Sequence, residues 1–145
     1  MSDDMMQLPD TTFHRVSLKA LIYDDQNRLL LFRNELDQWE LPGGGWDAGE
    51  SFEDCFKREL SEEIDGQISE IGNIEFCYQG KTSKGYPKVS IAVNVGLKDF
   101  ADKPKEADLQ EMRFFTRDEL ATLKFDEGDE AVLNHLNDIW RTNAN

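Results

Sequence analysis

The sequence predicts an α/β fold, an α/β/α sandwich built around a mixed β-sheet. Three observations predict it: strand-like alternation of apolar and polar residues comes first, one well-marked helix interrupts the strands, and two further helical patterns close the chain. Such elements pack in layers, because each must bury an apolar face against another element. At 145 residues the chain is long enough for one domain with a substantial core.

Two strands are predicted ahead of the first helix. Residues 1–12 are polar and acidic, and we expect a flexible N-terminal tail there, with the domain extending over residues 13–142. Residues 13–23 and 28–33 are rich in apolar residues, and the turn-forming sequence DDQN separates them. We therefore expect these two segments to pair as a β-hairpin.

The best-marked helix follows a glycine-rich turn and begins after Ser51, whose hydroxyl group is suited to cap it. Near its end, Glu59, Glu62 and Glu63 are spaced i, i+3, i+4 and share one helical face. Carboxylates this close repel one another unless a cation lies between them, and Mg²⁺ or Mn²⁺ prefers oxygen ligands. The helix therefore predicts a divalent-metal site. Its apolar stripe consists of Phe52, Cys55, Phe56 and Leu60.

The second half of the chain adds three strands and two helices. In order, the expected elements are a strand at 67–77 with an irregularity at Gly72-Asn73, a basic hairpin loop at 78–88, a strand at 89–97, a polar loop at 98–110, a strand at 111–116, a short helix at 117–124 and a longer helix at 129–141. This order of elements supports the layered fold.

The most specific pattern begins at Gly44, which is followed after five residues by Glu50 and after seven more by RELSEE at 58–63. This spacing resembles the Nudix box, G-x5-E-x7-R-E-U-x-E-E-x-G-U, where U is a bulky aliphatic residue. The preceding WELPGG at 39–44 is also similar to the family's approach to the box. The end of the box departs from the pattern, because Asp65-Gly66 stands where Gly and an aliphatic residue are expected. We expect Gly66 to supply a left-handed C-cap to the helix instead.

The resemblance implies the Nudix fold and a metal-dependent hydrolase. Such an enzyme cleaves the diphosphate bond of a nucleoside diphosphate linked to another moiety, such as a nucleoside triphosphate or a nucleotide sugar. Carried over by position, Glu59, Glu62 and Glu63 are similar to the family's metal ligands, and the carbonyl group of Gly43 resembles a further ligand for Mg²⁺ (or Mn²⁺). Arg58 would orient Glu59 through a salt bridge.

The resemblance also implies a general base, either a glutamate of the box or a carboxylate on a later loop. The loop candidates are Glu106, Asp108 and Glu111, and we choose Glu106. The family resemblance further suggests a homodimer.

Four residues are candidates for contact with the substrate. Arg33 ends a predicted strand and could meet a phosphate, although a surface arginine at the end of the strand is the simpler interpretation. Lys84 and Tyr86 lie in the predicted basic loop and could contact the substrate. Trp39 flanks the glycine turn and could stack on a base or pack in the core.

Charge and composition limit the partners. The formal net charge is −14, which repels nucleic-acid backbones and anionic membranes, so we expect a small-molecule substrate and neither of those partners. We find no signal-peptide pattern and no apolar run of membrane-spanning length, and expect a cytoplasmic protein. We expect Cys55 and Cys77 to be reduced core residues.

Two alternatives remain open. One is a non-hydrolytic sensor domain that binds a nucleotide or a nucleotide sugar, which would not need the intact RELSEE sequence. The other is diphosphate isomerisation, which would need a catalytic cysteine in the cleft, whereas Cys55 lies on the apolar stripe.

Overall fold

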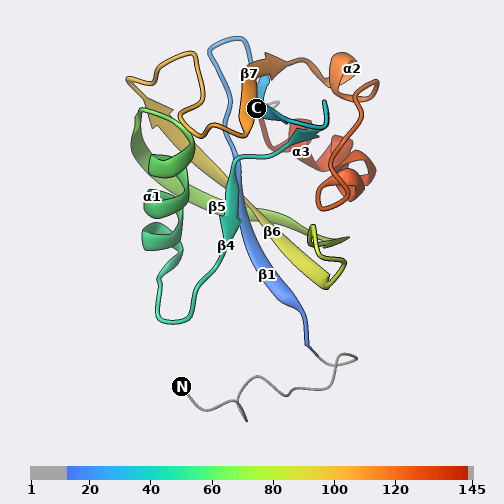
Figure 1. The fold of residues 1–145 in the computed structure, drawn as a ribbon. Helices are drawn as coiled ribbons and strands as arrows, with labels where there is room; N and C mark the ends of the chain where they lie inside the picture. Colours follow the sequence, from blue (N-terminus) through green and yellow to red (C-terminus); the bar gives the residue numbers. More distant parts are fainter. Residues whose placement is uncertain (1–12, 144–145) are drawn as a thin grey trace.

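The computed structural model describes residues 13–143, and the tail expected at residues 1–12 lies outside this range. The chain forms two β-sheets and several helices (Figure 1). The elements are β1 (Arg15–Leu21), β2 (Leu29–Asn34), β3 (Trp39–Glu40), β4 (Gly43–Gly45), α1 (Phe52–Glu63), β5 (Gln67–Lys81), β6 (Pro87–Lys98), β7 (Leu109–Phe115), α2 (Arg117–Leu120), the 3-10 helix η2 (Glu130–His135) and α3 (Leu136–Asn143).

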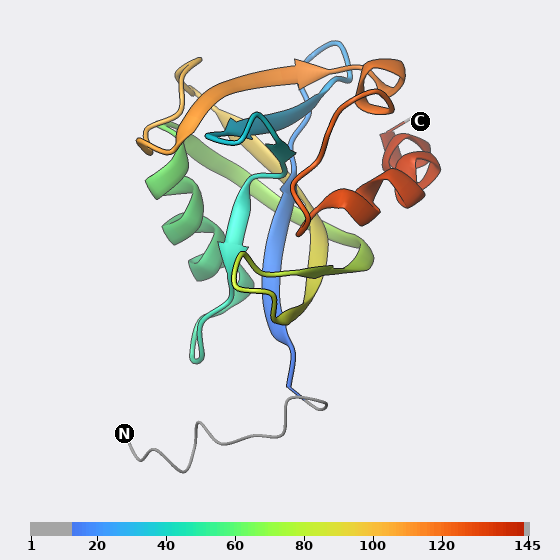
Figure 2. The ribbon, with the colours of Figure 1, turned by 45° about the vertical axis from the view of Figure 1, so that its right-hand side comes forward.

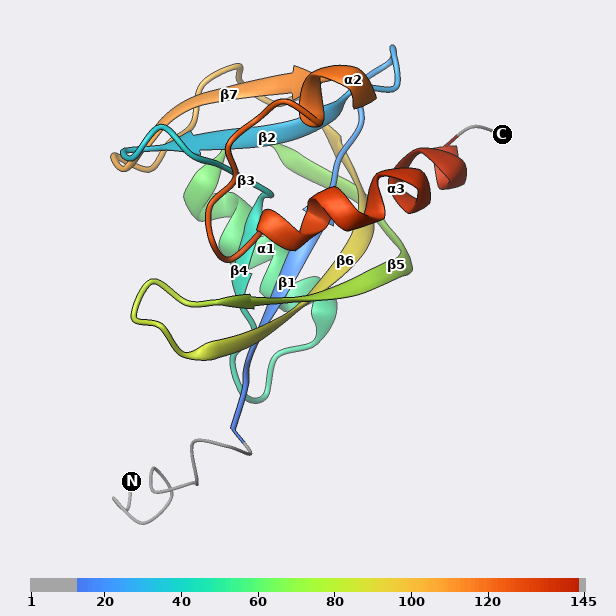
Figure 3. The same cartoon turned by 90° about the vertical axis from the view of Figure 1, so that its right-hand side faces the viewer.

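The larger sheet is mixed. Its four strands lie in the order β4-β1-β6-β5, with β1 parallel to β6 and the other neighbours antiparallel. The second sheet has the order β3-β2-β7, is antiparallel, and lies across one end of the first (Figure 3). The predicted mixed sheet is therefore confirmed.

Helices cover both faces of the larger sheet. Figure 2 shows α1 on one side and the C-terminal helices on the other. The alternation along β1 produces this arrangement, because Leu18 and Ala20 pack into the cluster that includes Phe56 of α1. Leu21 points the other way, into the cluster that includes Ile139 of α3. The predicted α/β/α sandwich is confirmed.

Helix α1 begins as predicted and ends differently. Ser51 caps it, and its Oγ accepts a hydrogen bond from the N–H of Asp54 at 3.1 Å. At the other end Ile64 is already extended, and Gly66 does not have a positive φ, so the predicted left-handed C-cap is wrong. Gly66 instead allows close packing, because a Cβ there would lie 2.8 Å from the Cβ of Phe100.

The predicted hairpin between the first two segments forms only at their adjoining ends, and the strands themselves do not pair. Strands β1 and β2 belong to different sheets, and the segments meet only around the turn, through the antiparallel bridge between Tyr23 and Leu29 and a hydrogen bond from the N–H of Leu30 to the carbonyl oxygen of Ile22. Strand β2 pairs with β3 and β7 instead. Its residues 29–32 are all buried, so both faces of this strand are covered. The short strands β3 and β4 were not predicted.

Several boundaries differ from the prediction. Strand β5 continues to Lys81, so the hairpin loop is shorter than 78–88, and the ladder shifts register between Ile71 and Ile74, where the irregularity was expected. Cys77 is exposed on this strand, which corrects its predicted place in the core, whereas Cys55 is buried; both thiols are free.

The C-terminal segment is less regular than predicted. Helix α2 has four residues, and the expected long helix begins as η2 before it continues as α3. Asp129 precedes η2 without capping it, because its carboxylate binds the N–H of Leu41 and the hydroxyl of Tyr78. Within residues 13–143, no helix combines the length and apolar character needed to cross a membrane.

Candidate active site

The candidate site begins at the glycine turn that connects the two sheets. Gly43 has φ of 123°, and a Cβ there would collide with the carbonyl oxygen of Leu18, so only glycine fits this approach of β4 to β1. A Cβ on Gly44 would lie 2.5 Å from the carboxyl carbon of Glu59. The turn is thus shaped to receive carboxylates from α1 directly against its backbone.

Glu63 is the most deeply placed carboxylate of the cluster. It is 4% exposed, and its Oε1 accepts a hydrogen bond from the N–H of Gly43 at 2.8 Å. Burial raises the pKa of Glu63 well above its ordinary value, against the opposing effects of Lys19 and of the Gly43 hydrogen bond. The Glu63 carboxylate therefore takes up a proton more readily than a free glutamate, and a nearby cation would favour its charged form.

Arg58 ties the turn to the helix. Its Nη1 pairs with Glu59 Oε1 at 2.7 Å, its Nε pairs with Glu50 Oε2 at 2.8 Å, and its Nη2 donates to the carbonyl oxygen of Gly45 at 2.8 Å. The predicted Arg58–Glu59 ion pair is therefore present. Hydrogen bonds from Arg58 and from the N–H of Asp47 lower the pKa of Glu50 to about 2.

The loop before β7 brings a further carboxylate to the end of α1. The N–H of Lys105 donates to the carbonyl oxygen of Glu63, and Lys105 Nζ donates to that of Ser61, both at 2.8 Å. These bonds hold Glu106 beside the helix. Burial, followed by repulsion from Asp108 and then from the helix glutamates, raises the pKa of Glu106 to about 7.

Four carboxylates thus gather at the end of α1: Glu59, Glu62, Glu63 and Glu106. Among the described residues, no three acidic, His or Cys side chains already enclose a point where a metal ion could bind. The donor chemistry nevertheless fits a hard divalent cation, because all the groups are oxygens and they repel one another. Glu62 is exposed and Glu106 is half-buried, so both have room to turn toward an ion.

The predicted substrate residues lie in different surroundings. Arg33 pairs with Asp37 at 2.7 Å and with Glu111 at 3.1 Å, so its guanidinium group is already engaged. Trp39 is 7% exposed and packs edge-on against the ring of Phe115, which makes it a core residue and corrects the suggestion that it stacks on a base.

Lys84 and Tyr86 are exposed in the turn between β5 and β6. No contact in the described structure joins either of them to the carboxylates of α1.

A buried polar network escaped the sequence analysis. Lys19 and Asp129 are 7% and 1% exposed and form an ion pair with 3.6 Å between Nζ and Oδ2. Tyr78 donates to Asp129 Oδ1 at 2.6 Å. The sequence signal was a lysine between the apolar residues Leu18 and Ala20, but nothing local identifies its partner.

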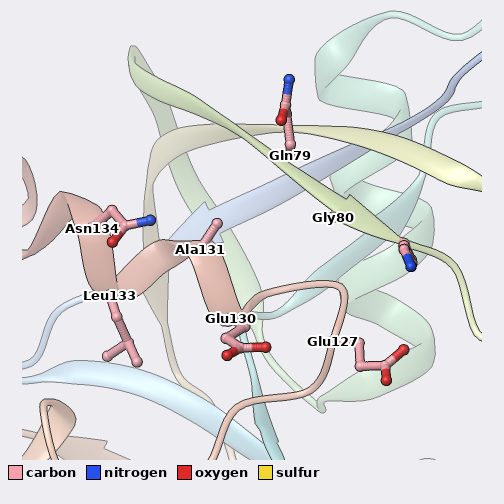
Figure 4. Close-up of a pocket in the computed structure, with 8 residues that line it drawn as sticks. Gln79, Gly80, Glu127, Glu130, Ala131, Leu133 and Asn134 are labelled. Carbon is pink, nitrogen blue, oxygen red and sulfur yellow. The ribbon is translucent and has the colours of Figure 1, made fainter.

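Two open pockets lie near the Lys19–Asp129 network and the carboxylates of α1. The larger, of about 620 Å³, lies between the end of β5 and residues 127–134, and Figure 4 shows its mixed lining, which includes Gln79, Glu130, Leu133 and Asn134. The other, of about 250 Å³, is lined by Asn34, Glu35, Leu36, Glu40, Asp108, Leu109 and Asp126. Because Asp108 also interacts with Glu106, the smaller pocket adjoins the carboxylate cluster.

The comparisons with known proteins concern the family and the fold. The family model described as NUDIX domain matches residues 13–136. An RNA pyrophosphohydrolase of Ruthia magnifica subsp. Calyptogena magnifica is 41% identical over 56 residues, which span 38% of this chain and 31% of the relative's own length. The chain thus covers less than a third of that curated relative.

Two solved structures share the fold. The MutT protein of Methanosarcina mazei Go1 has a TM-score of 0.73 and 19% identity, covering 91% of this chain and 96% of its own. The NUDIX domain of Shewanella oneidensis NrtR, solved in complex with ADP ribose, has a TM-score of 0.67 and 17% identity, covering 100% of both chains. At these identities the likeness establishes the architecture.

The raised pKa of Glu106 makes a testable prediction about stability. A carboxyl group whose pKa is higher in the folded than in the unfolded protein binds more protons when folded, so its contribution to stability is lost as the pH rises from about 4.5 toward about 7. Without divalent metal, Glu106→Gln should therefore gain stability relative to the wild type between pH 5 and pH 8. We expect a gain on the order of 1 kcal/mol, after allowing for solvent screening.

Urea unfolding at both pH values measures this difference. Glu70→Gln, at an exposed position on β5, serves as the control. If Glu106→Gln and the wild type changed in parallel with pH, Glu106 would not be under the repulsion described here.

Proposed function

This chain belongs to the NUDIX domain family, and from that premise we propose that it is a metal-dependent hydrolase of a nucleoside diphosphate linked to another moiety. The observation that supports this proposal most strongly is the gathering of Glu59, Glu62, Glu63 and Glu106 at the end of α1, where burial and mutual repulsion raise the pKa values of Glu63 and Glu106. A structural helix end would not need four carboxylates in one place, since like charges destabilise it. A site that binds a divalent cation and a diphosphate does need several carboxylates.

In this proposal Mg²⁺ (or Mn²⁺) is held by Glu59, Glu62 and Glu63 together with the carbonyl group of Gly43. When bound, the ion neutralises charge on the diphosphate and lowers the pKa of the attacking water. The residues around it prepare the site. Arg58 fixes the Glu59 carboxylate against Gly44, and the N–H of Gly43 fixes the Glu63 carboxylate.

Glu106 is the proposed general base. Its pKa of about 7 suits a group that must accept a proton near neutral pH, because a base acts best when its pKa is close to the working pH. The neighbouring Asp108 carboxylate repels the charged form of Glu106 and so favours proton uptake by Glu106. The hydrogen bonds from Lys105 to Glu63 and Ser61 keep this loop in reach of the helix.

The smaller pocket is the proposed place for the nucleoside. Its lining carries the carboxylates of Glu35, Glu40, Asp108 and Asp126, so it repels phosphate and favours groups that donate hydrogen bonds. Ribose hydroxyl groups and base amino groups have this character. We propose that the diphosphate lies over the carboxylates of α1 and that the nucleoside points into this pocket.

Two alternative functions, binding without hydrolysis and diphosphate isomerisation, would use these residues differently. A binding-only sensor would recognise the nucleotide without hydrolysis, and the turnover assay below decides between the two functions. Diphosphate isomerisation is disfavoured, because Cys55 is fully buried and burial raises the pKa of its thiol to about 11. A cytoplasmic location, a homodimeric state and the absence of nucleic-acid partners remain predictions from the sequence.

The proposed function predicts metal-dependent turnover. Wild-type protein should release phosphate, after a coupled phosphatase, from one class in a panel of nucleoside triphosphates, dinucleoside polyphosphates, nucleotide sugars, ADP-ribose and 5′-triphosphorylated RNA. Release should require Mg²⁺ or Mn²⁺ and stop with a chelator. Glu63→Gln should lower turnover roughly 100-fold or more, because it removes a charged ligand from the site.

Glu53→Gln is the matched control, since Glu53 lies exposed on the same helix and pairs with Lys57. Equal turnover by Glu63→Gln and the wild type would contradict the assignment. No turnover by folded protein that binds Mn²⁺ would favour the sensor.

A second prediction tests the shape of the turn. Gly44→Ala would place a Cβ against the Glu59 carboxylate, whereas the nearest atom to a Cβ on Gly45 is Arg15 Nη2 at 4.0 Å. We expect Gly44→Ala to reduce turnover by about 10-fold or more through displacement of Glu59, and Gly45→Ala to have a much smaller effect. Steady-state kinetics at saturating Mg²⁺ measures both. Equal losses in the two variants would show that the contact between Gly44 and Glu59 is not used.

A further inference from the structure

The link between β3 and β4 passes from one sheet to the other at Leu41. Leu41 is fully buried, and side chains bind both of its backbone polar groups. Its N–H donates to Asp129 Oδ2 at 2.8 Å, and its carbonyl oxygen accepts from Lys19 Nζ at 3.2 Å. Buried backbone groups left without partners would cost free energy, so this crossing depends on two charged side chains.

The two side chains are distant in sequence and held firmly. Lys19 and Asp129 pair with each other, and Tyr78 donates to the second oxygen of Asp129. Burial works against a charged Lys19, but Asp129, Glu40 and Glu63 more than offset it, so the pKa of Lys19 is raised overall. The lysine therefore stays charged inside the protein.

The same short segment continues into the candidate site. Lys19 is directly opposite Gly43 in the pairing of β1 with β4, and the N–H of Ala20 donates to the carbonyl oxygen of Pro42 at 2.8 Å. Gly43 then donates to Glu63 at 2.8 Å. Residues 41–43 are thus fixed by Lys19 and Asp129 at one end and meet Glu63 at the other.

We propose that Lys19 and Asp129 are positioning residues, which clamp Leu41 so that the backbone of Gly43 is placed to hold Glu63 for the metal. The metal part of this inference rests on the proposed function. Neither residue needs to touch the substrate, because both act through the Leu41 backbone. The clamp also makes the metal site depend on residue 129, which the C-terminal segment supplies.

The test must separate positioning from plain stability. Lys19→Met removes the donor to the Leu41 carbonyl group. The double variant Lys19→Met/Asp129→Asn removes both charges and keeps an acceptor for the Leu41 N–H, so it avoids leaving one buried charge unpaired. Leu120→Ala is the control, because Leu120 is fully buried in the same core cluster as Leu41, but its apolar side chain cannot take part in the hydrogen bonds of the clamp.

Two measurements are made on each variant. Amide hydrogen exchange of Gly43, followed by NMR in metal-free protein, reports whether Gly43 still binds Glu63. Titration with Mn²⁺ alone, followed by electron paramagnetic resonance, reports the affinity of the site. We expect both clamp variants to exchange the Gly43 amide at least about 10-fold faster than the control at matched stability, and to bind Mn²⁺ about 10-fold or more weakly.

The proposal would be overturned if both clamp variants exchanged the Gly43 amide and bound Mn²⁺ as the wild type does. It would also be overturned if Leu120→Ala accelerated this exchange as much as the clamp variants do. If the wild type itself bound no Mn²⁺, the proposed function would fail, and Gly43 exchange would still decide whether the clamp exists.

Discussion

Crowding of negative charge at the end of α1 is the constraint on which the rest of the structure depends. Three glutamates occupy the last two turns, where the helix dipole is also negative and no basic residue lies in the last turn. The protein offsets part of this with Arg58 on Glu59 and with the Gly43 N–H on Glu63. Glu106 is then added to the same region. The remaining excess of negative charge accounts for the affinity for a divalent cation that we propose.

The irregular segment that connects the two sheets lies next to this concentration of negative charge. The chain crosses between the two sheets at residues 41–42, and neither ladder binds the N–H or the carbonyl oxygen of Leu41 there. Side chains from β1 and from the start of η2 do so instead. The next residues form the glycine turn against which the α1 carboxylates pack. Stability of the crossing and geometry of the candidate site therefore depend on the same few hydrogen bonds.

Local patterns were sufficient to predict α1, its Ser51 cap and the layered architecture, because periodicity and spacing act within a few residues. Sequence reasoning also placed Glu106 on the loop before β7. It failed where a partner lies far along the chain. Apolar alternation does not encode which strand β2 pairs with, and no local signal joins Lys19 to Asp129. The burial of Trp39 likewise follows from its packing against Phe115 on β7.

The most direct test of the central claim is anomalous diffraction from crystals of the protein soaked in Mn²⁺. The account predicts an anomalous peak bounded by the Glu59 and Glu63 carboxylates and the backbone of Gly43, with Glu62 or Glu106 turned toward it. A fully soaked crystal with no peak there, or with Mn²⁺ bound only at another acidic surface, would contradict the claim that these carboxylates gather to hold a metal ion.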